Sequence, residues 1–379
     1  MQALSPELRA YAERVEEVAT AFEADAYTWQ GEIPWENLRL LADEGLYCPS
    51  IDEAYGGEGM SDLASVVLTE AVSRACPDTG WFVYTQSMVG PRAIDLFGSE
   101  SVKEAYLPGV TAGEDHISIA ISEPDAGSDV GNMTTTVEEE DGRLVCNGEK
   151  MWVGGVPFSD VAVTWVGFPE GLGSVVLPLD DPGIEVVEEY RNMAGYSQTQ
   201  FSIDDVEIPT DHVLTRGEDG FKQQLVSLNW ERLGSSTLAI GWAAAALERA
   251  LAYADEREQF GQSLDEFQGI EWKLAEMYRE LETAAGVVYN TAASADGHES
   301  APSRLKTSVA KLHASQVAEE VISEAVQIVG ARAYQQGHPL EYLYRLARGR
   351  RIAAGTDEMQ LNTIARALKG DGVPKVSER

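Results

Sequence analysis

Basic residues are scarce in this chain, which has 28 Lys and Arg against 63 Asp and Glu and a formal net charge of −35. A field of that sign repels nucleic-acid phosphates and anionic lipid, so neither is an expected partner. The acidic residues are scattered along the whole chain and do not form one tail. This pattern favours a surface adapted to high salt, as in a halophile, because dissolved ions screen charge repulsion over short distances. The alternative is an ordinary acidic surface.

Cysteine is also rare, since only Cys48, Cys76 and Cys146 occur and they lie far apart. Their number and spacing exclude a disulfide framework and a cysteine-based zinc site, and fit a reducing cytoplasm. The 5 histidines lack metal-ligand spacing, so no metal is expected. The first residues lack the basic and apolar regions of a signal peptide. The most apolar stretch, Leu233–Leu247, is too short to cross a membrane, and we predict a cytoplasmic protein without a membrane partner.

Two motifs of large enzyme classes are missing from the sequence. No Gly-x-Gly-x-x-Gly opens a helix after a strand, so a Rossmann dinucleotide site is not supported. No Gly-x-Ser-x-Gly occurs, so the nucleophile turn of an α/β-hydrolase is not supported either. The chemistry must therefore come from other segments.

The periodicity of apolar residues divides the chain into three parts. At 379 residues the chain exceeds the usual size of one hydrophobic core, so two or three domains are expected. Helical spacing dominates up to about residue 112, and the period changes from 3.6 to 2 near His116. Helical spacing returns from about Gly220, in segments near 221–259, 265–293, 303–330 and 356–369. We predict an α+β protein with a helical domain at 1–113, an antiparallel β domain at 114–217 and a helical domain at 218–379.

Two segments of the predicted β domain suit a nucleotide cofactor. The first reads Ile119-Ala-Ile-Ser-Glu-Pro-Asp-Ala-Gly-Ser-Asp129, and the amides and hydroxyls of its turn suit a pyrophosphate or a flavin edge. The second reads Asn147-Gly-Glu-Lys-Met-Trp-Val-Gly154, a hairpin turn followed by a strand that carries Trp152. By composition alone, the first is any turn at a strand end and Trp152 is a core aromatic.

Two further segments lie in the C-terminal part. One reads Ala252-Tyr-Ala-Asp-Glu-Arg-Glu-Gln-Phe-Gly-Gln-Ser-Leu264, followed by Phe267 and Gln268. Its arginine, Arg257, can hold a pyrophosphate through two hydrogen bonds, although it could equally be a solvated helix residue. The other comprises Gln327-Ile-Val-Gly330, Arg345 and Ala353-Ala-Gly-Thr-Asp-Glu-Met-Gln360.

Together the four segments resemble the motifs of the acyl-CoA dehydrogenase family, over about residues 5–370. The resemblance implies that family's fold, with an N-terminal helical domain, a middle β domain and a C-terminal four-helix bundle. It also implies FAD as cofactor, an acyl-CoA thioester as substrate and electron-transfer flavoprotein as the electron acceptor. A homotetramer, or dimer of dimers, is expected because some of the cofactor contacts cross a subunit interface.

The same resemblance assigns cofactor-binding residues. From the β domain they are Ile121, Ser122, Ser128, Trp152 and Gly154, of which Trp152 lies against the isoalloxazine and Ser128 also contacts substrate. Gly154 departs from the family, which usually has a hydroxyl there for flavin N5, so only a backbone N–H can serve. In the C-terminal part the resemblance implies two sets of FAD-binding residues. Those that reach the FAD of another subunit are Arg257, Phe260, Gln268 and Gln327. The others are Gly330, Thr356 and Glu358.

The catalytic base departs from the commonest family pattern. Ala354 stands where many members keep a glutamate, and alanine cannot remove the Cα proton. The family has a second location for the base, a Glu-Arg dipeptide in isovaleryl-type and long-chain-type members, which matches Glu231 and Arg232. We therefore predict Glu231 as the base and Arg232 as a residue near the CoA moiety. The alternative is an ordinary solvated Glu-Arg pair near a helix start.

Three functions remain open at this point. The first is a dehydrogenase for a short or branched acyl-CoA, favoured by the relocated glutamate and by the space that Ala353 and Ala354 leave. The second keeps the fold and FAD but changes the reaction to that of a reductase, a desulfinase or a flavin monooxygenase. The third is a non-catalytic CoA-binding relative.

Overall fold

The structure is a computed structural model and describes residues 4–217, 219–295 and 302–375. Its first part is helical. Ser5 and Ser99 begin two of these helices, because each hydroxyl accepts a hydrogen bond from the N–H three residues later, at 3.2 and 3.3 Å. The helices are α1 (Pro6–Ala19), α2 (Trp35–Asp43), α3 (Asp62–Ala75), α4 (Pro77–Met88), α5 (Gly90–Phe97) and α6 (Glu100–Thr111).

A β-sheet follows, with strand order β6-β7-β3-β2-β4-β5-β8 among the described residues and β1 paired to β4. The strands are β1 (His116–Ala120), β2 (Thr136–Glu140), β3 (Arg143–Gly154), β4 (Ser159–Phe168), β5 (Gly171–Pro178), β6 (Ile184–Arg191), β7 (Ser197–Ile208) and β8 (Val213–Thr215). The prediction of an antiparallel domain is wrong for two pairings, since β1 and β2 both run parallel to β4. Strand β6 was not predicted, because it is a sheet edge whose Val186 and Val187 are both half exposed and show no alternation.

The last part is helical again. It comprises α7 (Gly220–Glu256), a small hairpin of β9 (Glu258–Gln259) and β10 (Gln262–Ser263), then α8 (Gln268–Ala293), α9 (Arg304–Val329), α10 (Pro339–Arg350) and α11 (Asp357–Asp371). Helix α10 was not predicted. Its buried Leu340, Leu343 and Leu346 have helical spacing, but the helix is short and its other positions are rich in arginine.

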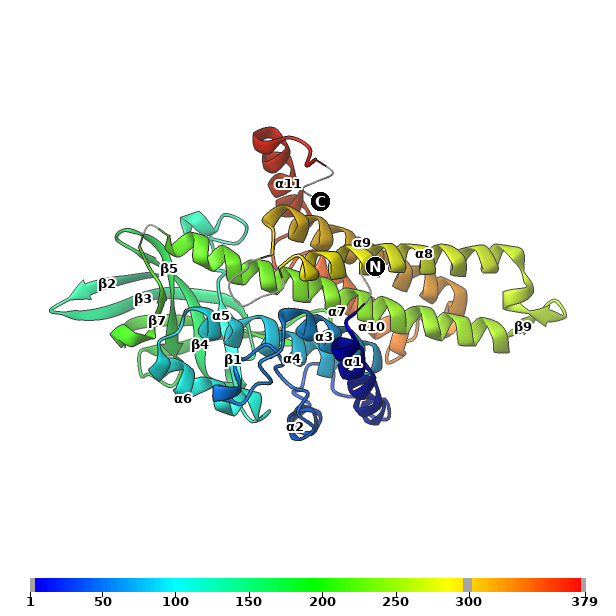
Figure 1. The fold of residues 1–379 in the computed structure, drawn as a ribbon, viewed down its shortest axis with the longest axis horizontal. Helices are drawn as coiled ribbons and strands as arrows, with labels where there is room; N and C mark the ends of the chain where they lie inside the picture. The colour runs from blue at the N-terminus through cyan, green and yellow to red at the C-terminus, as the bar shows by residue number, and fades with distance from the viewer. Residues whose placement is uncertain (1–3, 218, 296–301, 376–379) are drawn as a thin grey trace.

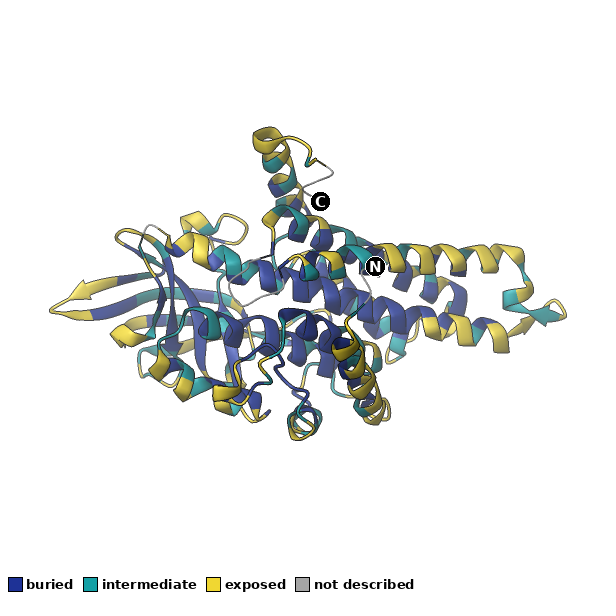
Figure 2. Cartoon of the chain, in the orientation of Figure 1, coloured by how far each residue is buried: buried dark blue, intermediate teal, exposed yellow. Residues whose placement is uncertain are grey.

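Helix α7 is the axis of the molecule (Figure 1). One end lies beside the sheet, its middle packs against α3, α4 and α9, and its far end reaches the β9–β10 hairpin. The middle is almost wholly buried and rich in alanine and serine, which lets neighbouring helices approach closely. The far ends of α7 and α8 are largely exposed (Figure 2), so this end has no cover within one chain.

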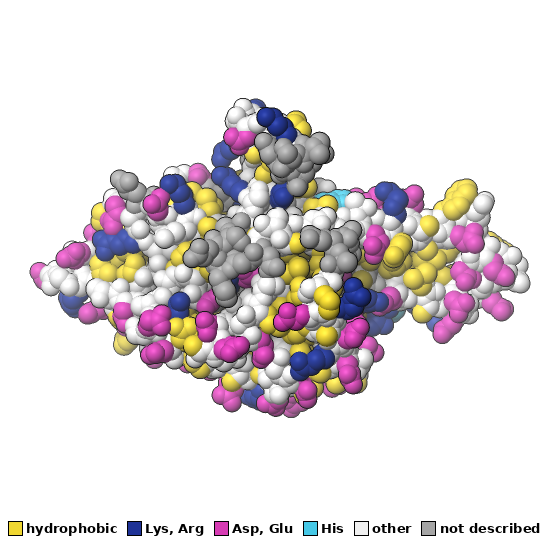
Figure 3. Space-filling view, viewed as in Figure 1, with side chains coloured by type: hydrophobic (Ala, Val, Ile, Leu, Met, Phe, Trp, Pro, Cys, Tyr) yellow, Lys and Arg dark blue, Asp and Glu magenta, His cyan; other side chains and the backbone are white. Residues whose placement is uncertain are grey.

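Acidic side chains are spread over the face of the molecule shown in Figure 3 and do not form one patch. Among the described residues, no helix has both the length and the apolar character needed to cross a membrane. The described residues also contain no cluster of His, Cys, Asp and Glu that could hold a metal ion.

Candidate active site

A cavity of about 420 Å³ lies where the three parts of the chain meet. Most of its wall is apolar or aromatic, which is usual for a small-molecule site. Helix α4, strand β3, helix α7 and helix α10 contribute Trp81, Thr85, Trp152, Gly154, Glu231 and Arg350.

Glu231 brings the only carboxylate of that wall among the described residues. It projects from α7 between Trp230 and Arg232, both of which are buried. Burial raises the pKa of the Glu231 carboxyl to about 7, against the opposing fields of Arg232, Arg350 and Lys311. A carboxyl with such a pKa is ionised in part at neutral pH and can both accept and release a proton.

The turn before α11 closes the cavity beside Glu231. Ala354 and Gly355 both have left-handed backbones, with φ of 57° and 89°, and Ala353 contributes to the wall. Three side chains fix this turn: Arg232 Nε donates to the Ala354 carbonyl at 3.1 Å, Lys311 Nζ donates to the Gly355 carbonyl at 2.7 Å, and Gln360 Nε2 donates to Gly355 at 2.9 Å. The turn is therefore held in one conformation, and the side chain at 354 is only a methyl group.

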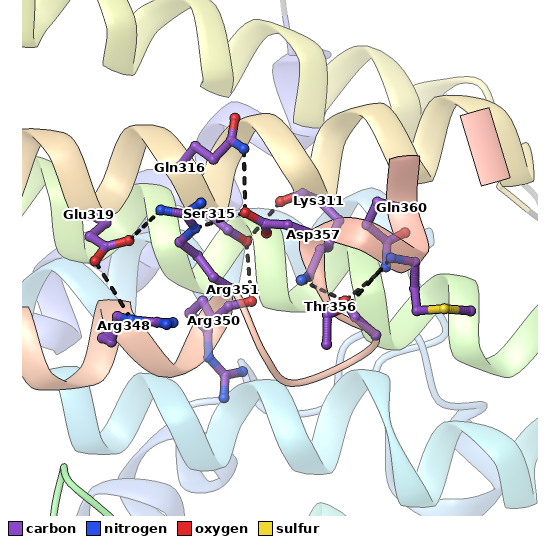
Figure 4. Close-up of polar contacts among 12 residues, drawn as sticks. Lys311, Ser315, Gln316, Glu319, Arg348, Arg350, Arg351, Thr356, Asp357 and Gln360 are labelled. Carbon is purple, nitrogen blue, oxygen red and sulfur yellow. Dashed lines mark hydrogen bonds and ion pairs between the residues drawn. The ribbon is translucent and has the colours of Figure 1, made fainter. Parts of the chain in front are cut away.

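A cluster of charged side chains anchors α11 to α9 on the other side of that turn (Figure 4). Arg351 donates to Asp357 at 2.8 Å and to Glu319 at 2.9 Å, and Gln316 donates to Asp357 at 3.3 Å. Thr356 caps α11 by accepting from the Met359 N–H at 3.4 Å. The predicted FAD residue Thr356 thus has a structural contact as well, whereas Glu358 is exposed in the first turn of α11.

The loop between β1 and β2 carries the predicted residues Ile121, Ser122 and Ser128. Buried Glu123 fixes this loop, because its carboxylate accepts from the backbone N–H groups of Thr134 and Thr135 at 2.6 and 3.0 Å. Lys150 Nζ donates to Glu123 at 2.9 Å and to the Ile121 carbonyl at 3.2 Å. The Glu123–Lys150 pair was not predicted, although both residues lie within the quoted motifs.

These contacts place the loop next to strand β3. The Met151 N–H donates to the Ser122 carbonyl at 2.8 Å, directly before Trp152. Trp152 has a left-handed backbone (φ 63°), is half exposed and lies 4.8 Å from the Tyr190 ring. A side chain added at Gly154 would meet no atom within 4 Å. An exposed indole beside open space and a loop with exposed Ser128 fit the edge of a planar cofactor, so the residues present are compatible with a bound flavin.

The remaining predicted residues lie away from the cavity within one chain. Arg257 ends α7, Phe260 is 97% exposed in the β9–β10 hairpin, and Gln268 begins α8. Gln327 is exposed near the end of α9 and Gly330 follows that helix with φ 70°. The hairpin lies at the opposite end of the molecule from the sheet (Figure 1), so Phe260 and the flanking Arg257 and Gln268 lie far from the β-domain part of the same chain's site. The contact of Arg257, Phe260, Gln268 and Gln327 with the FAD of another subunit stays a prediction, as does the approach of Gly330 to FAD.

Arg232, predicted to lie near the CoA moiety, contacts other parts of the chain in this structure; its role toward CoA stays a prediction. Besides the Ala354 carbonyl, its guanidinium donates to Asn229 Oδ1 at 3.4 Å, and it is 7% exposed. The first contact holds the turn, and the second lies within α7. Two residues of the wall, Trp81 and Arg350, were missed by the sequence analysis, because nothing local in the sequence indicates that α4 and the unpredicted α10 meet at this cavity.

Family models describe nearly the whole chain: the N-terminal domain of acyl-CoA dehydrogenase matches residues 4–114, its middle domain matches 118–206 and its C-terminal domain matches 218–369. The probable acyl-CoA dehydrogenase YngJ of Bacillus subtilis is 33% identical, over 89% of this chain and 90% of that protein. The 3-sulfinopropanoyl-CoA desulfinase of Advenella mimigardefordensis is 31% identical, over 100% of this chain and 97% of that protein. A glutaryl-coenzyme A dehydrogenase solved with glutaryl-CoA has a TM-score of 0.90 and 27% identity, over 100% of this chain and 98% of that one. The chain belongs to the acyl-CoA dehydrogenase family.

Proposed function

We propose that this oxidoreductase forms a double bond between Cα and Cβ of a short or branched acyl-CoA thioester. The observation that carries the proposal is the setting of Glu231, a partly buried carboxyl with a pKa raised to about 7 in the wall of an apolar cavity. The alternative position for a base, residue 354, holds an alanine. Glu231 is thus the carboxylate available to the substrate's α-carbon.

In the proposed reaction the ionised Glu231 removes a proton from Cα. The electron pair left behind forms the new double bond as hydrogen leaves Cβ with its two electrons. FAD is the cofactor and, when bound, supplies the acceptor for that hydride. Because burial favours the neutral, protonated form of Glu231, the carboxyl can keep the proton until the product leaves.

The residues proposed to hold FAD fall into two groups. Within one subunit they are those of the β1–β2 loop and strand β3, and Thr356 and Glu358 at α11. From other subunits they are Arg257, Phe260, Gln268 and Gln327, which requires at least a dimer and suits a homotetramer. Gly330, directly after α9, is proposed to approach FAD as well. The exposed Phe260, Trp272 and Tyr278 at the uncovered end of α7 and α8 support an interface there.

The preference for a short or branched acyl group rests on the cavity wall. Ala353 contributes a small side chain to it, Trp81 and Leu346 contribute large ones, and the cavity volume is about 420 Å³. An anaerobic titration of the FAD-loaded protein with butyryl-, isovaleryl- and palmitoyl-CoA, read as loss of flavin absorbance, tests this. We expect the first two to bleach the flavin, and an exclusive response to palmitoyl-CoA would overturn the proposed chain preference. No response to any thioester would overturn the dehydrogenase itself.

A second candidate function is altered flavin chemistry, and the desulfinase relative over the full chain favours it. We propose that the reduced protein passes its electrons to electron-transfer flavoprotein. The way in which the reduced flavin is reoxidised therefore distinguishes the dehydrogenase from the other flavin reactions. Reoxidation by that partner and slow reaction with O₂ support the dehydrogenase, whereas rapid reaction with O₂ supports a monooxygenase. Sulfite release from 3-sulfinopropanoyl-CoA without lasting loss of flavin colour supports a desulfinase. Purified protein without flavin would favour a non-catalytic CoA-binding relative.

The dispersed acidic surface supports a further part of the proposal, a cytoplasm of high salt concentration as the protein's setting. Repulsion among the 63 acidic residues destabilises the folded state at low ionic strength and is screened by salt. We expect the unfolding midpoint to rise steeply between low and molar KCl. A flat response would indicate an ordinary acidic protein.

A further inference from the structure

Arg350, the last residue of α10, places a buried cation in the cavity wall beside Glu231. It is 4% exposed, and its guanidinium carbon lies 4.3 Å from the centre of the Trp81 ring. Helix α4 and helix α10 therefore bring an aromatic ring and a buried guanidinium together in the cavity wall.

The partners of Arg350 are neutral. One guanidinium nitrogen lies 3.5 Å from Ser235 Oγ, another interaction is with the Tyr84 phenol, and the buried Nε has no hydrogen-bond partner. Within the described part of the chain, no carboxylate lies within ion-pair distance of it; Glu231 influences it only through its field. A buried guanidinium with an unsatisfied donor is costly unless something else supplies an acceptor.

Neighbouring arginines on the same segment show what Arg350 lacks. Arg345 pairs with Glu341 at 2.6 Å, Arg348 with Glu319 at 3.9 Å, and Arg351 with Asp357 at 2.8 Å. Figure 4 shows the Arg350 guanidinium directed away from the cluster of Glu319, Arg351 and Asp357. Arg345 and Arg348 also line the cavity, but of these four arginines only Arg350 has no carboxylate partner among the described residues, in a chain with more than twice as many acidic as basic residues.

We propose that the acyl group of the substrate ends in an anionic group, a carboxylate or its close analogue, which Arg350 binds. This rests on the proposed function, since it takes the cavity to be the acyl site. A guanidinium presents paired N–H donors that match a carboxylate, and the aromatic wall around it strengthens the interaction by excluding water. With Glu231 acting at Cα and Arg350 in the same cavity, the substrate is the thioester of a short dicarboxylic acid or a similar diacid. Glutaryl-CoA and 3-sulfinopropanoyl-CoA, named for two of the relatives, are thioesters of this kind.

The test compares two thioesters of equal chain length, glutaryl-CoA with a terminal carboxylate and valeryl-CoA with a terminal methyl group. For the FAD-loaded protein we expect kcat/KM for flavin bleaching to favour glutaryl-CoA by about 10- to 100-fold, the contribution of a charged hydrogen bond. Arg350→Met should abolish that preference, by lowering the glutaryl-CoA value and leaving the valeryl-CoA value within a few fold. Arg350→Lys should retain part of it. Arg348→Met is the matched control and should keep the preference, because Arg348 also lines the cavity but is partly exposed and already has Glu319 as its carboxylate partner.

A binding measurement guards against a variant that merely misfolds. Quenching of tryptophan fluorescence by each thioester gives a dissociation constant without turnover, and flavin content reports folding. A wild-type preference for valeryl-CoA overturns the inference whatever the variants do. An equal loss for both thioesters in a folded Arg350→Met protein also overturns it, because Arg350 would then act only on Glu231. If neither thioester nor any other bleaches the flavin, the proposed function itself fails.

Discussion

Two glutamates withdrawn from solvent have opposite acid–base properties in this protein. Glu123, in the loop before β2, has a pKa lowered to about 2, whereas Glu231, on α7, has a pKa raised to about 7. Burial raises the pKa at both positions. At Glu123, hydrogen bonds from Thr134 and Thr135 and the ammonium of Lys150 together outweigh burial.

Glu231 lacks such partners. In the described part of the chain no group donates a hydrogen bond to its carboxylate, and the nearby cations act on it only through their fields. Nearby positive charge alone therefore does not determine whether a buried carboxylate stays ionised or exchanges a proton. Direct donors make a carboxylate permanently ionised and structural, and their absence leaves one that can exchange a proton.

The largest effect on stability is expected from removing the Glu123 carboxylate. Glu123→Gln leaves Lys150 buried without a counter-charge, since the side chains of the pair are 3% and 0% exposed. We expect the free energy of unfolding to fall by about 3–5 kcal/mol, measured by denaturant unfolding at fixed salt. The matched control is Glu207→Gln in the same domain, which breaks the exposed pair with Arg143 and should cost about 0–1 kcal/mol. Equal losses for the two variants would contradict this account of the loop.

The pH dependence sharpens the comparison, because the two groups act in opposite directions. Glu123 binds its proton less readily in the folded than in the unfolded chain, so its stabilisation is present above pH 4.5 and is lost as the pH falls towards about 2. Glu231 must be ionised to act as a base, so the rate of flavin bleaching should rise with pH through about 7 and level off above it. A rate that is flat from pH 5 to pH 9 would argue against Glu231.

A smaller change should follow from removing one of the cations near Glu231. Arg350 favours the ionised carboxylate, so Arg350→Met should move the rise in rate to higher pH. The measurement is the same pH series with a neutral thioester, which avoids the terminal charge. A shift to lower pH would mean that the two groups do not interact as described.

Much of this fold could be predicted from the sequence, whereas the roles of the predicted site residues stay predictions. The change of period near His116 and its return near Gly220 set out three parts, and the family resemblance gave their architecture. Glu231 could be predicted as the base because position 354 holds an alanine and a Glu-Arg pair stands in the family's second location, and the structure places it in the cavity wall. What periodicity could not show was strand β6, exposed on both faces, and helix α10, whose apolar positions are few and interrupted by arginines.

Two features of the site region could not be predicted, for a physical reason. Arg350 lies on the helix that was not predicted, and its lack of a carboxylate partner depends on which way its side chain turns at the end of α10. The Glu123–Lys150 pair joins residues 27 positions apart, through a loop whose path the sequence does not specify. Both features arise from packing between segments, which local patterns do not encode.

The central claim is that Glu231 removes the Cα proton, and one anaerobic measurement tests it most directly. FAD-loaded wild type, Glu231→Gln and the control Glu248→Gln, an exposed glutamate on the same helix, are each mixed with an acyl-CoA while flavin absorbance is recorded. We predict that all three proteins bind the thioester and that wild type and the control bleach at similar rates. Glu231→Gln should bleach about 10²- to 10⁴-fold more slowly. Bleaching of Glu231→Gln at the wild-type rate would contradict the account.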